Sequence, residues 1–88
     1  MTLAFTETGW EDYEYWMSNN PTVITRIHDL LRDIRRHPFK GIGKPEPLRG
    51  SLAGWWSRRI TGEHRLVYRV EGSSPNQKAI IIQLRYHY

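Results

Sequence analysis

The sequence predicts a single α+β domain in which two helices pack on an antiparallel sheet. Apolar side chains recur at helical spacing in the first part of the chain and alternate with polar ones in the last part. A loop rich in proline and glycine separates the two parts. Because 88 residues leave no room for a second fold, we expect residues 1–88 to form one domain.

The first part is expected to begin with a short strand followed by a helix. Met1 to Phe5 has the pattern of a strand. Thr8 and Glu11 have the spacing of a capping box, which predicts that the helix begins at Thr8. Large apolar residues then follow at helical spacing: Trp10, Tyr13, Trp16 and Met17.

A second helix is expected directly after the first. Asn20 is a favourable N-cap, and Pro21 suits the first helical position because its missing N–H has no partner there anyway. One apolar stripe runs along this helix: Val23, Ile27, Leu30, Leu31 and Ile34. The helix should end near His37, because Pro38 disfavours helical geometry in the residue before it. The short connection predicts an antiparallel helical hairpin.

The second part of the chain predicts a three-stranded meander. Residues 38–54 form a loop stiffened by three prolines. Three strand-like segments follow it, at residues 55–60, 64–71 and 78–86. Short turns between consecutive strands indicate antiparallel pairing.

Alternation along these segments predicts a core face and a basic face. The residues of the expected core face are Trp56, Ile60, Leu66, Tyr68, Val70, Ile80, Ile82, Leu84 and Tyr86. The opposite face is expected to collect cations from three strands, at Arg59, Arg65, Arg69 and Arg85, with His87 at its end. Like charges on one face repel unless an anion neutralises them. This face therefore favours a phosphate site over a merely solvated surface.

The charge of the chain points to the same kind of partner. Residues 1–20 contain four acids and no Lys or Arg, whereas residues 21–88 contain thirteen basic residues against five acids, a net charge of +8. Ten of the thirteen are arginines, which bind phosphate through two parallel hydrogen bonds. A compact arginine-rich segment of this kind suggests a polyanion such as nucleic acid.

Several classes of chemistry lack support. The chain has no cysteine, and its four histidines show no short paired spacing, so we expect no metal site and no cofactor. Neither a nucleophile elbow nor a complete phosphate-binding loop is present. No apolar run approaches the roughly 20 residues of a membrane span. No signal peptide is recognisable, and the lack of cysteine fits a reducing compartment, so a cytoplasmic protein is expected.

Cleavage of RNA without a metal needs a base for the 2′-hydroxyl, an acid for the departing 5′-oxygen, and cations for the phosphorane. Glu46 is a candidate base, because Pro45 and Pro47 restrict its backbone and fix the direction of its carboxylate. His87 is a candidate acid, since imidazole titrates near neutral pH.

The remaining groups for this chemistry come from the basic face and the chain terminus. Arg65 and Arg59 are candidate phosphate ligands. Tyr88 could stack on a base or donate a hydrogen bond.

With these residues in this order, the sequence resembles the Txe/YoeB-type toxins of the RelE superfamily. These toxins are ribosome-dependent mRNA endonucleases of bacterial toxin–antitoxin pairs. The resemblance covers essentially the whole chain. Its main blocks, in order, are residues 10–16, 35–39, 43–48, 56–61, 63–68 and the terminal Arg85-Tyr86-His87-Tyr88.

The resemblance implies a role for each site residue. Glu46 would be the general base and His87 the general acid. Arg65 would stabilise the scissile phosphate, and Tyr88 would help to hold the substrate. Arg59 and Arg49 would contact RNA, and Glu63 would orient its neighbours. It also implies a microbial-ribonuclease-like fold and action on mRNA in the A site of the 70S ribosome. The implied partners are a Phd/YefM-type antitoxin, operator DNA bound only together with that antitoxin, and a second copy of the chain in a homodimer.

Three other functions remain open at this stage. A non-catalytic RNA- or ribosome-binding module would need the arginines without Glu46 or His87. A ParE-like toxin would act on DNA gyrase, and a purely structural regulator would only bind an antitoxin. The segment from Glu71 to Lys78 looks longer than is usual in the family, and we expect a tolerated surface turn there.

Overall fold

The computed structural model describes residues 1–86. Its elements, in chain order, are β1 (Thr2–Phe5), α1 (Glu7–Asn19), α2 (Pro21–Arg36), β2 (Glu46–Pro47), a 3₁₀ turn η1 (Gly50–Leu52), β3 (Trp56–Arg59), β4 (Arg65–Glu71) and β5 (Lys78–Gln83). The strands form one sheet in the order β1-β5-β4-β3-β2. Strand β1 pairs in parallel with β5, and the other pairs are antiparallel. The predicted α+β fold is confirmed, with a mixed sheet.

The first helix begins earlier than the capping box predicts. Thr6, and not Thr8, is the N-cap, and its Oγ1 accepts a hydrogen bond from the N–H of Gly9 at 3.1 Å. The backbone N–H of Thr6 also donates to the carbonyl of Ile81 at 3.0 Å. Because Thr6 is the last residue held against β5, the chain turns into the helix there. Non-local strand pairing therefore sets the helix start.

The second helix has the predicted bounds. Asn20 Oδ1 accepts from the N–H of Val23 at 3.2 Å, Pro21 is the first helical residue, and His37 is the C-cap. The five residues of the predicted apolar stripe are all buried. This side of α2 forms the centre of the core.

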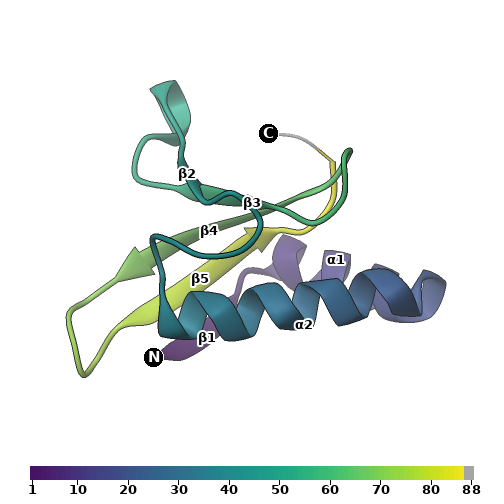
Figure 1. The fold of residues 1–88 in the computed structure, drawn as a ribbon, viewed down its shortest axis with the longest axis horizontal. Coiled ribbons are helices and arrows are strands. Elements are labelled where there is room, and N and C mark those ends of the chain that lie inside the picture. The colour runs from purple at the N-terminus through teal and green to yellow at the C-terminus, as the bar shows by residue number, and fades with distance from the viewer. Residues whose placement is uncertain (87–88) are drawn as a thin grey trace.

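Both helices cover one face of the sheet (Figure 1). The buried core joins α1 and α2 to β4, β5 and the residues that directly follow β3 and β5. It includes Trp16, Ile27, Leu30, Ile34, Ile60, Leu66, Tyr68, Ala79, Ile81 and Leu84. Within residues 1–86 no helix is long and apolar enough to cross a membrane.

The predicted core face is wrong for β5. Ala79 and Ile81 face the helices, whereas Ile80 and Ile82 are only half-buried. Tyr68 lies opposite Ile81, and Val67 lies opposite Gln83, so a bulge leaves Ile82 as an extra residue. The bulge returns Leu84 to the core face, which breaks the simple alternation that Ile80, Ile82 and Leu84 predict.

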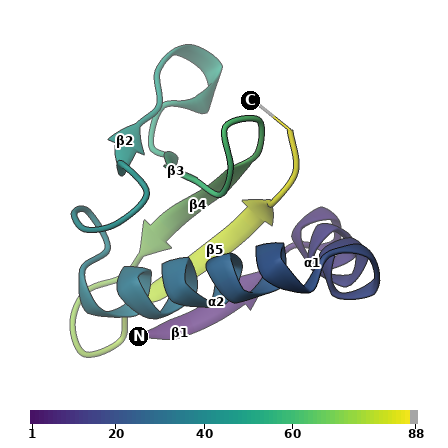
Figure 2. The same ribbon diagram turned by 45° about the vertical axis from the view of Figure 1, so that its right-hand side comes forward.

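Within residues 1–86, no α-helix covers the other face of the sheet. The segment around η1 rises beyond β2 and β3, and the chain that follows β5 runs back toward the same side (Figure 2). Residues 72–77 form an exposed or half-exposed turn between β4 and β5, as expected of a surface turn. We call this open surface, between the η1 segment and residues 84–86, the helix-free face.

Candidate functional site

The strand register places Glu46 on the helix-free face. Glu46 lies opposite Ser57, Ser57 lies opposite Val67, and Val67 lies opposite Gln83. Residues directly opposite each other in antiparallel strands point to the same face. Ser57 and Val67 are buried, whereas Glu46 is exposed. Glu46 therefore lies at the exposed end of a row across β2, β3 and β4 whose other members, Ser57 and Val67, are buried.

Arg59 and Arg65 form the next row on this face. They lie directly opposite each other across β3 and β4, two residues along from Ser57 and Val67. Arg59 is exposed and Arg65 is half-buried. Two cations in this position repel each other, so an anion bound between them would be stabilised. Strands β2 and β4 are two strand spacings apart, roughly 10 Å, a span that a nucleotide can cross.

The guanidinium of Arg65 is held in place by the turn between β3 and β4. Its Nη1 donates to the carbonyls of Thr61, Gly62 and His64 at 2.8, 3.2 and 3.1 Å. Within residues 1–86, Nε and Nη2 of Arg65 have no such protein acceptor. A cation held on one edge, with donors left on the other, is preorganised for an oxyanion.

Of the four arginines predicted to gather on this face, only Arg59 and Arg65 form an adjacent pair of cations in the described residues. Arg69 forms an ion pair with Glu71, and its guanidinium lies 4.8 Å from the centre of the Trp55 ring. The guanidinium of Arg85 lies 3.6 Å from the centre of the Tyr15 ring on α1. The expectation for Arg85 is therefore wrong, because the bulge and the end of β5 direct its side chain toward the helix.

Strand β2 fixes the position of Glu46 and was not predicted. Prolines on both sides suggested a loop, but Glu46 and Pro47 pair with β3. A shallow pocket of about 350 Å³ lies beside them. Its lining residues are Glu46, Pro47, Leu48, Arg49 and Leu52. Arg49 and Glu46 thus line the same pocket.

The remaining predicted site residues are less well connected to this surface. Glu63 is exposed in the turn between β3 and β4, where its backbone N–H donates to Thr61 Oγ1 at 3.2 Å. His87 and Tyr88 lie outside the described residues. Within residues 1–86 no cluster of three His, Asp or Glu side chains could hold a metal ion.

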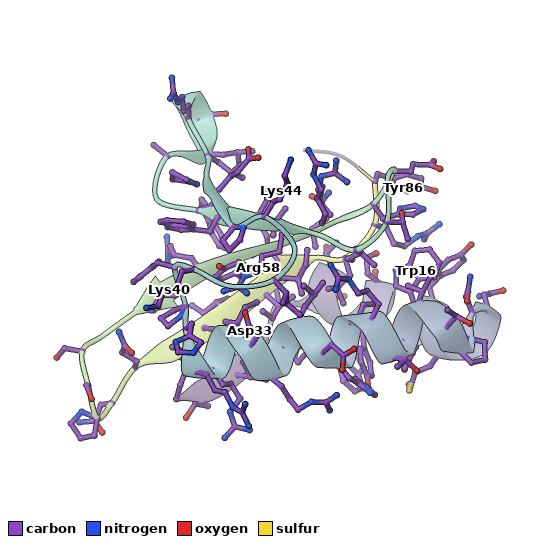
Figure 3. All side chains as sticks on the ribbon, in the orientation of Figure 1. Trp16, Asp33, Lys40, Lys44, Arg58 and Tyr86 are labelled. Carbon is purple, nitrogen blue, oxygen red and sulfur yellow. The ribbon has the colours of Figure 1, made fainter. Side chains whose placement is uncertain are left out.

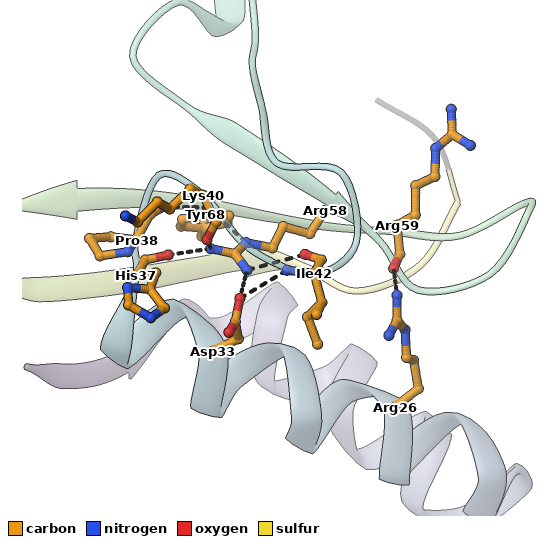
Figure 4. A network of polar contacts seen from close by, with 9 residues as sticks. All are labelled: Arg26, Asp33, His37, Pro38, Lys40, Ile42, Arg58, Arg59 and Tyr68. Carbon is orange, nitrogen blue, oxygen red and sulfur yellow. Dashed lines mark hydrogen bonds and ion pairs between the residues drawn. The ribbon is translucent and has the colours of Figure 1, made fainter.

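Arg58 is a buried residue whose role the sequence pattern did not predict. It lies between Arg59 and Ser57 in sequence but points to the core face, and none of its surface is exposed. Its Nη1 forms an ion pair with Asp33 at 2.5 Å, and its Nε donates to the Tyr68 hydroxyl at 3.1 Å (Figure 4). The guanidinium also donates to the backbone carbonyls of His37, Lys40 and Ile42.

This buried network ties the loop after α2 to the sheet. Tyr68 donates to the carbonyl of Pro38 at 2.6 Å, and Asp33 accepts from the N–H of Ile42 at 3.0 Å. Figure 3 shows Arg58 between α2 and the sheet, with Asp33 beneath it and Lys40 on the loop. The same loop leads into β2, so the network helps to set where Glu46 lies. A charged residue at a core position of the alternation was the signal for it.

The network also shifts two pKa values. Burial favours the neutral acid at Asp33, but the hydrogen bonds from Arg58 and Ile42 and the charge of Arg58 outweigh it, so the pKa of Asp33 lies below its ordinary value. Burial raises the pKa of Tyr68, against the opposing effect of the Arg58 hydrogen bond. Asp33 is therefore the anion of the network, and Tyr68 remains a neutral donor.

The comparisons with known proteins agree with this fold. Residues 5–88 match the model of the YoeB-like toxin of bacterial type II toxin–antitoxin systems. The chain is 51% identical to toxin YoeB of Streptomyces coelicolor and 49% identical to toxin YoeB of Escherichia coli K12, each over all 88 residues and the full length of both chains.

Solved structures show the same architecture. A YoeB/ParE toxin from Agrobacterium tumefaciens superposes with a TM-score of 0.95 at 52% identity, with 100% of both chains covered. YafQ from E. coli shares the fold alone, with a TM-score of 0.77 at 11% identity over 97% of this chain and 91% of the other. The fold and the sequence together define a toxin of a type II toxin–antitoxin system with RelE-like architecture. Within that class, the chain belongs to the YoeB-like toxin family.

Proposed function

We propose that this toxin is an endoribonuclease that cleaves mRNA in the A site of the bacterial ribosome, without a metal ion, and so stops translation in the cytoplasm. The observation that carries the proposal is the register of β2, β3 and β4. It places a carboxylate, Glu46, on the same open face as the adjacent cations Arg59 and Arg65. Membership in the YoeB-like family supports it.

In the proposed mechanism Glu46 takes the proton from the ribose 2′-hydroxyl. The 2′-oxygen attacks the adjacent phosphorus and forms a phosphorane, whose charge Arg65 stabilises. His87 then protonates the departing 5′-oxygen. The products are a 2′,3′-cyclic phosphate and a free 5′-hydroxyl. No redox change or metal-bound water is needed.

The other site residues would bind the RNA. Arg59 is exposed beside Arg65 and would contact a neighbouring phosphate. Arg49 lines the pocket next to Glu46 and would bind the backbone on that side. Tyr88 would hold the substrate at the chain terminus, and Glu63 would orient groups near the turn.

We also propose that a Phd/YefM-type antitoxin binds this chain, that the pair binds operator DNA, and that the chain forms a homodimer. Solved structures of Staphylococcus aureus relatives are described as a YoeB–YefM complex, at 42% identity and a TM-score of 0.87, and as a YoeB dimer, at 39% identity and a TM-score of 0.88. Each covers 100% of this chain and 98% of the other. Their similarity over the full chain supports both partners.

The experiment is cleavage of an mRNA whose ribose at the cut site is replaced by 2′-deoxyribose. We expect cleavage to stop while binding to the ribosome persists, because the nucleophile has been removed. The unmodified mRNA should give a 2′,3′-cyclic phosphate end, and Glu46→Gln should slow its formation. Continued cutting of the deoxy substrate would exclude the mechanism. Binding without cleavage of either RNA would instead favour a non-catalytic module.

A further inference from the structure

Two hydrogen bonds to α1 hold the segment that follows β5. The indole Nε1 of Trp16 donates to the carbonyl of Leu84 at 2.9 Å, and the N–H of Leu84 donates to Asp12 Oδ2 at 2.9 Å. Both partners come from α1. Trp16 and Tyr86 lie toward the same end of the molecule in Figure 3. Helix α1 therefore fixes where this segment leaves the sheet.

Tyr86, two residues further on, has a backbone conformation that bulky residues rarely adopt. Its φ is +63°, in the left-handed region. Its side chain is 55% exposed, so burial of the ring does not impose this conformation. A non-glycine residue in this region is strained and persists only where its surroundings hold it.

Two successive residues make the shorter hydrogen bonds to the backbone of Tyr86. Its N–H donates to Nδ1 of the His64 ring at 2.8 Å, and its carbonyl accepts from the N–H of Arg65 at 3.1 Å. Both lie where β4 begins, and Arg65 is itself the proposed phosphate ligand. Gln83 Nε2 also lies 3.5 Å from the Tyr86 carbonyl, at the limit of a hydrogen bond, so the contact through the His64 ring is the shorter of the two that depend on a side chain.

The position of the His64 ring is itself fixed. The ring is half-buried and packs edge-on against Trp16, with centroids 4.8 Å apart and planes at 79°. To accept from Tyr86, Nδ1 must carry no proton, so the neutral ring has its proton on Nε2. His64 thus connects α1, the start of β4 and the end of the chain.

We propose that His64 is a positioning residue that fixes the direction in which the chain leaves Tyr86. The two residues after Tyr86 in the sequence are the proposed acid His87 and Tyr88, so this inference rests on the proposed function. A catalytic group displaced by about 1 Å can lose on the order of 100-fold in rate. Holding Tyr86 in its left-handed conformation therefore serves catalysis.

Two substitutions separate the hydrogen bond from the packing. His64→Phe keeps a ring against Trp16 but removes the acceptor, whereas His64→Asn keeps an acceptor close to the position of Nδ1. We expect kcat on ribosome-bound mRNA to fall by about 10–100-fold in His64→Phe with KM within about threefold. His64→Asn should retain kcat within about threefold of wild type. Thermal unfolding of both variants checks that each is folded.

Hydrogen exchange at the Tyr86 amide tests the contact without reference to catalysis. We expect slow exchange in wild type and in His64→Asn, and faster exchange in His64→Phe. Unprotected exchange in wild type would overturn the proposal, as would an unchanged kcat in His64→Phe. If the Tyr86 amide of the wild-type chain exchanged slowly but ribosome-bound mRNA stayed intact, the proposed function would be wrong. The slow exchange would then show that the contact between His64 and Tyr86 is nevertheless present.

Discussion

Three arginines on adjoining positions of β3 and β4 have different surroundings and therefore different uses. Arg58 is fully buried and satisfied by Asp33, Tyr68 and backbone carbonyls. Arg59 is exposed, and the partly buried guanidinium of Arg65 is held on one edge by three carbonyls. Only a cation that is both fixed and accessible can stabilise a transition state without reorganising. Arg65 alone of the three meets both conditions.

The first prediction at the residue scale ranks these cations. Arg65→Ala should reduce kcat by about 100–1,000-fold, the usual loss for one preorganised donor to a transition state. Arg59→Ala and Arg49→Ala should lose about tenfold or less, because their exposed side chains bind phosphate without being fixed. Single-turnover cleavage of ribosome-bound mRNA measures all three. Equal, small losses at the three positions would indicate diffuse phosphate binding instead.

The second prediction at this scale concerns Asp33. Asp33→Ala removes the anion facing the buried Arg58 and should cost about 3 kcal/mol in the free energy of unfolding. Because the pKa of Asp33 is lowered in the folded state, its contribution is present above its ordinary pKa near 3.8 and is lost as pH falls through the lower folded value. The difference from wild type should therefore shrink in acid.

Urea unfolding at neutral and at acidic pH measures this difference. Asp29→Asn is the matched control, since its ion pair with Arg32 is exposed and should be worth no more than about 1 kcal/mol. If the two substitutions lowered the free energy of unfolding equally at neutral pH, the expected contribution of the buried network to stability would be wrong.

At the scale of elements, local signals predicted what local interactions decide. The bounds of α2 followed from Asn20, Pro21 and the residue before Pro38, and the structure has them. The start of α1 did not follow from Thr8, because pairing of Thr6 with β5 decides it. The prediction of which β5 side chains face the core was wrong because of a bulge, which alternation in the sequence cannot reveal.

In the candidate site, too, local patterns predicted some residue positions, whereas non-local contacts decide the others. Arg59 and Arg65 could be placed on one face from alternation within two neighbouring strands, and the register puts them opposite each other. The pairing of Glu46 with Ser57 joins segments across a long loop, so no local pattern predicts it. Alternation puts Arg58 on the core face between Trp56 and Ile60, but its charge predicts exposure. A buried charge with five acceptors is visible only once the loop closes over it.

The prediction at this scale tests the loop that delivers β2. Gly43 has a φ of +79°, its carbonyl accepts from the N–H of Arg59, and an added Cβ would lie 2.7 Å from Leu30 Cδ2 and 3.2 Å from the Arg59 carbonyl oxygen. Gly43→Ala should therefore lower the free energy of unfolding by about 1–3 kcal/mol. It should also slow cleavage by displacing Glu46.

Gly62→Ala is the control for this substitution. Gly62 has no atom within 4 Å of an added Cβ and no positive φ, so its change in stability should stay within about 0.5 kcal/mol. Thermal unfolding and single-turnover cleavage of both variants give the comparison. A Gly43→Ala chain as stable and as active as Gly62→Ala would show that the loop is not closely packed against β3.

At the scale of the whole molecule, the two faces of the sheet have separate tasks. The helices cover one face and build the core, and the other face carries Glu46, Arg59 and Arg65. The molecule measures only 35 × 28 × 25 Å along its principal axes. A face of this size offers few contacts for choosing one site on a flexible single strand. Under the proposed function, selection and orientation of the RNA therefore come mainly from another body.

The last prediction is that the ribosome supplies this orientation. Holding reactants in place can provide about 7–11 kcal/mol of a barrier, far more than a few phosphate contacts on a free strand. Cleavage of one mRNA should thus be faster by several orders of magnitude on a stalled ribosome than naked, at equal protein concentration. Residues 21–88 carry a net charge of +8, so association with the ribosome should weaken steeply as salt is raised. Primer extension on both samples over a salt series measures the rates and their salt dependence. Similar rates on naked and ribosome-bound mRNA would contradict ribosome dependence and would favour a free-standing small ribonuclease.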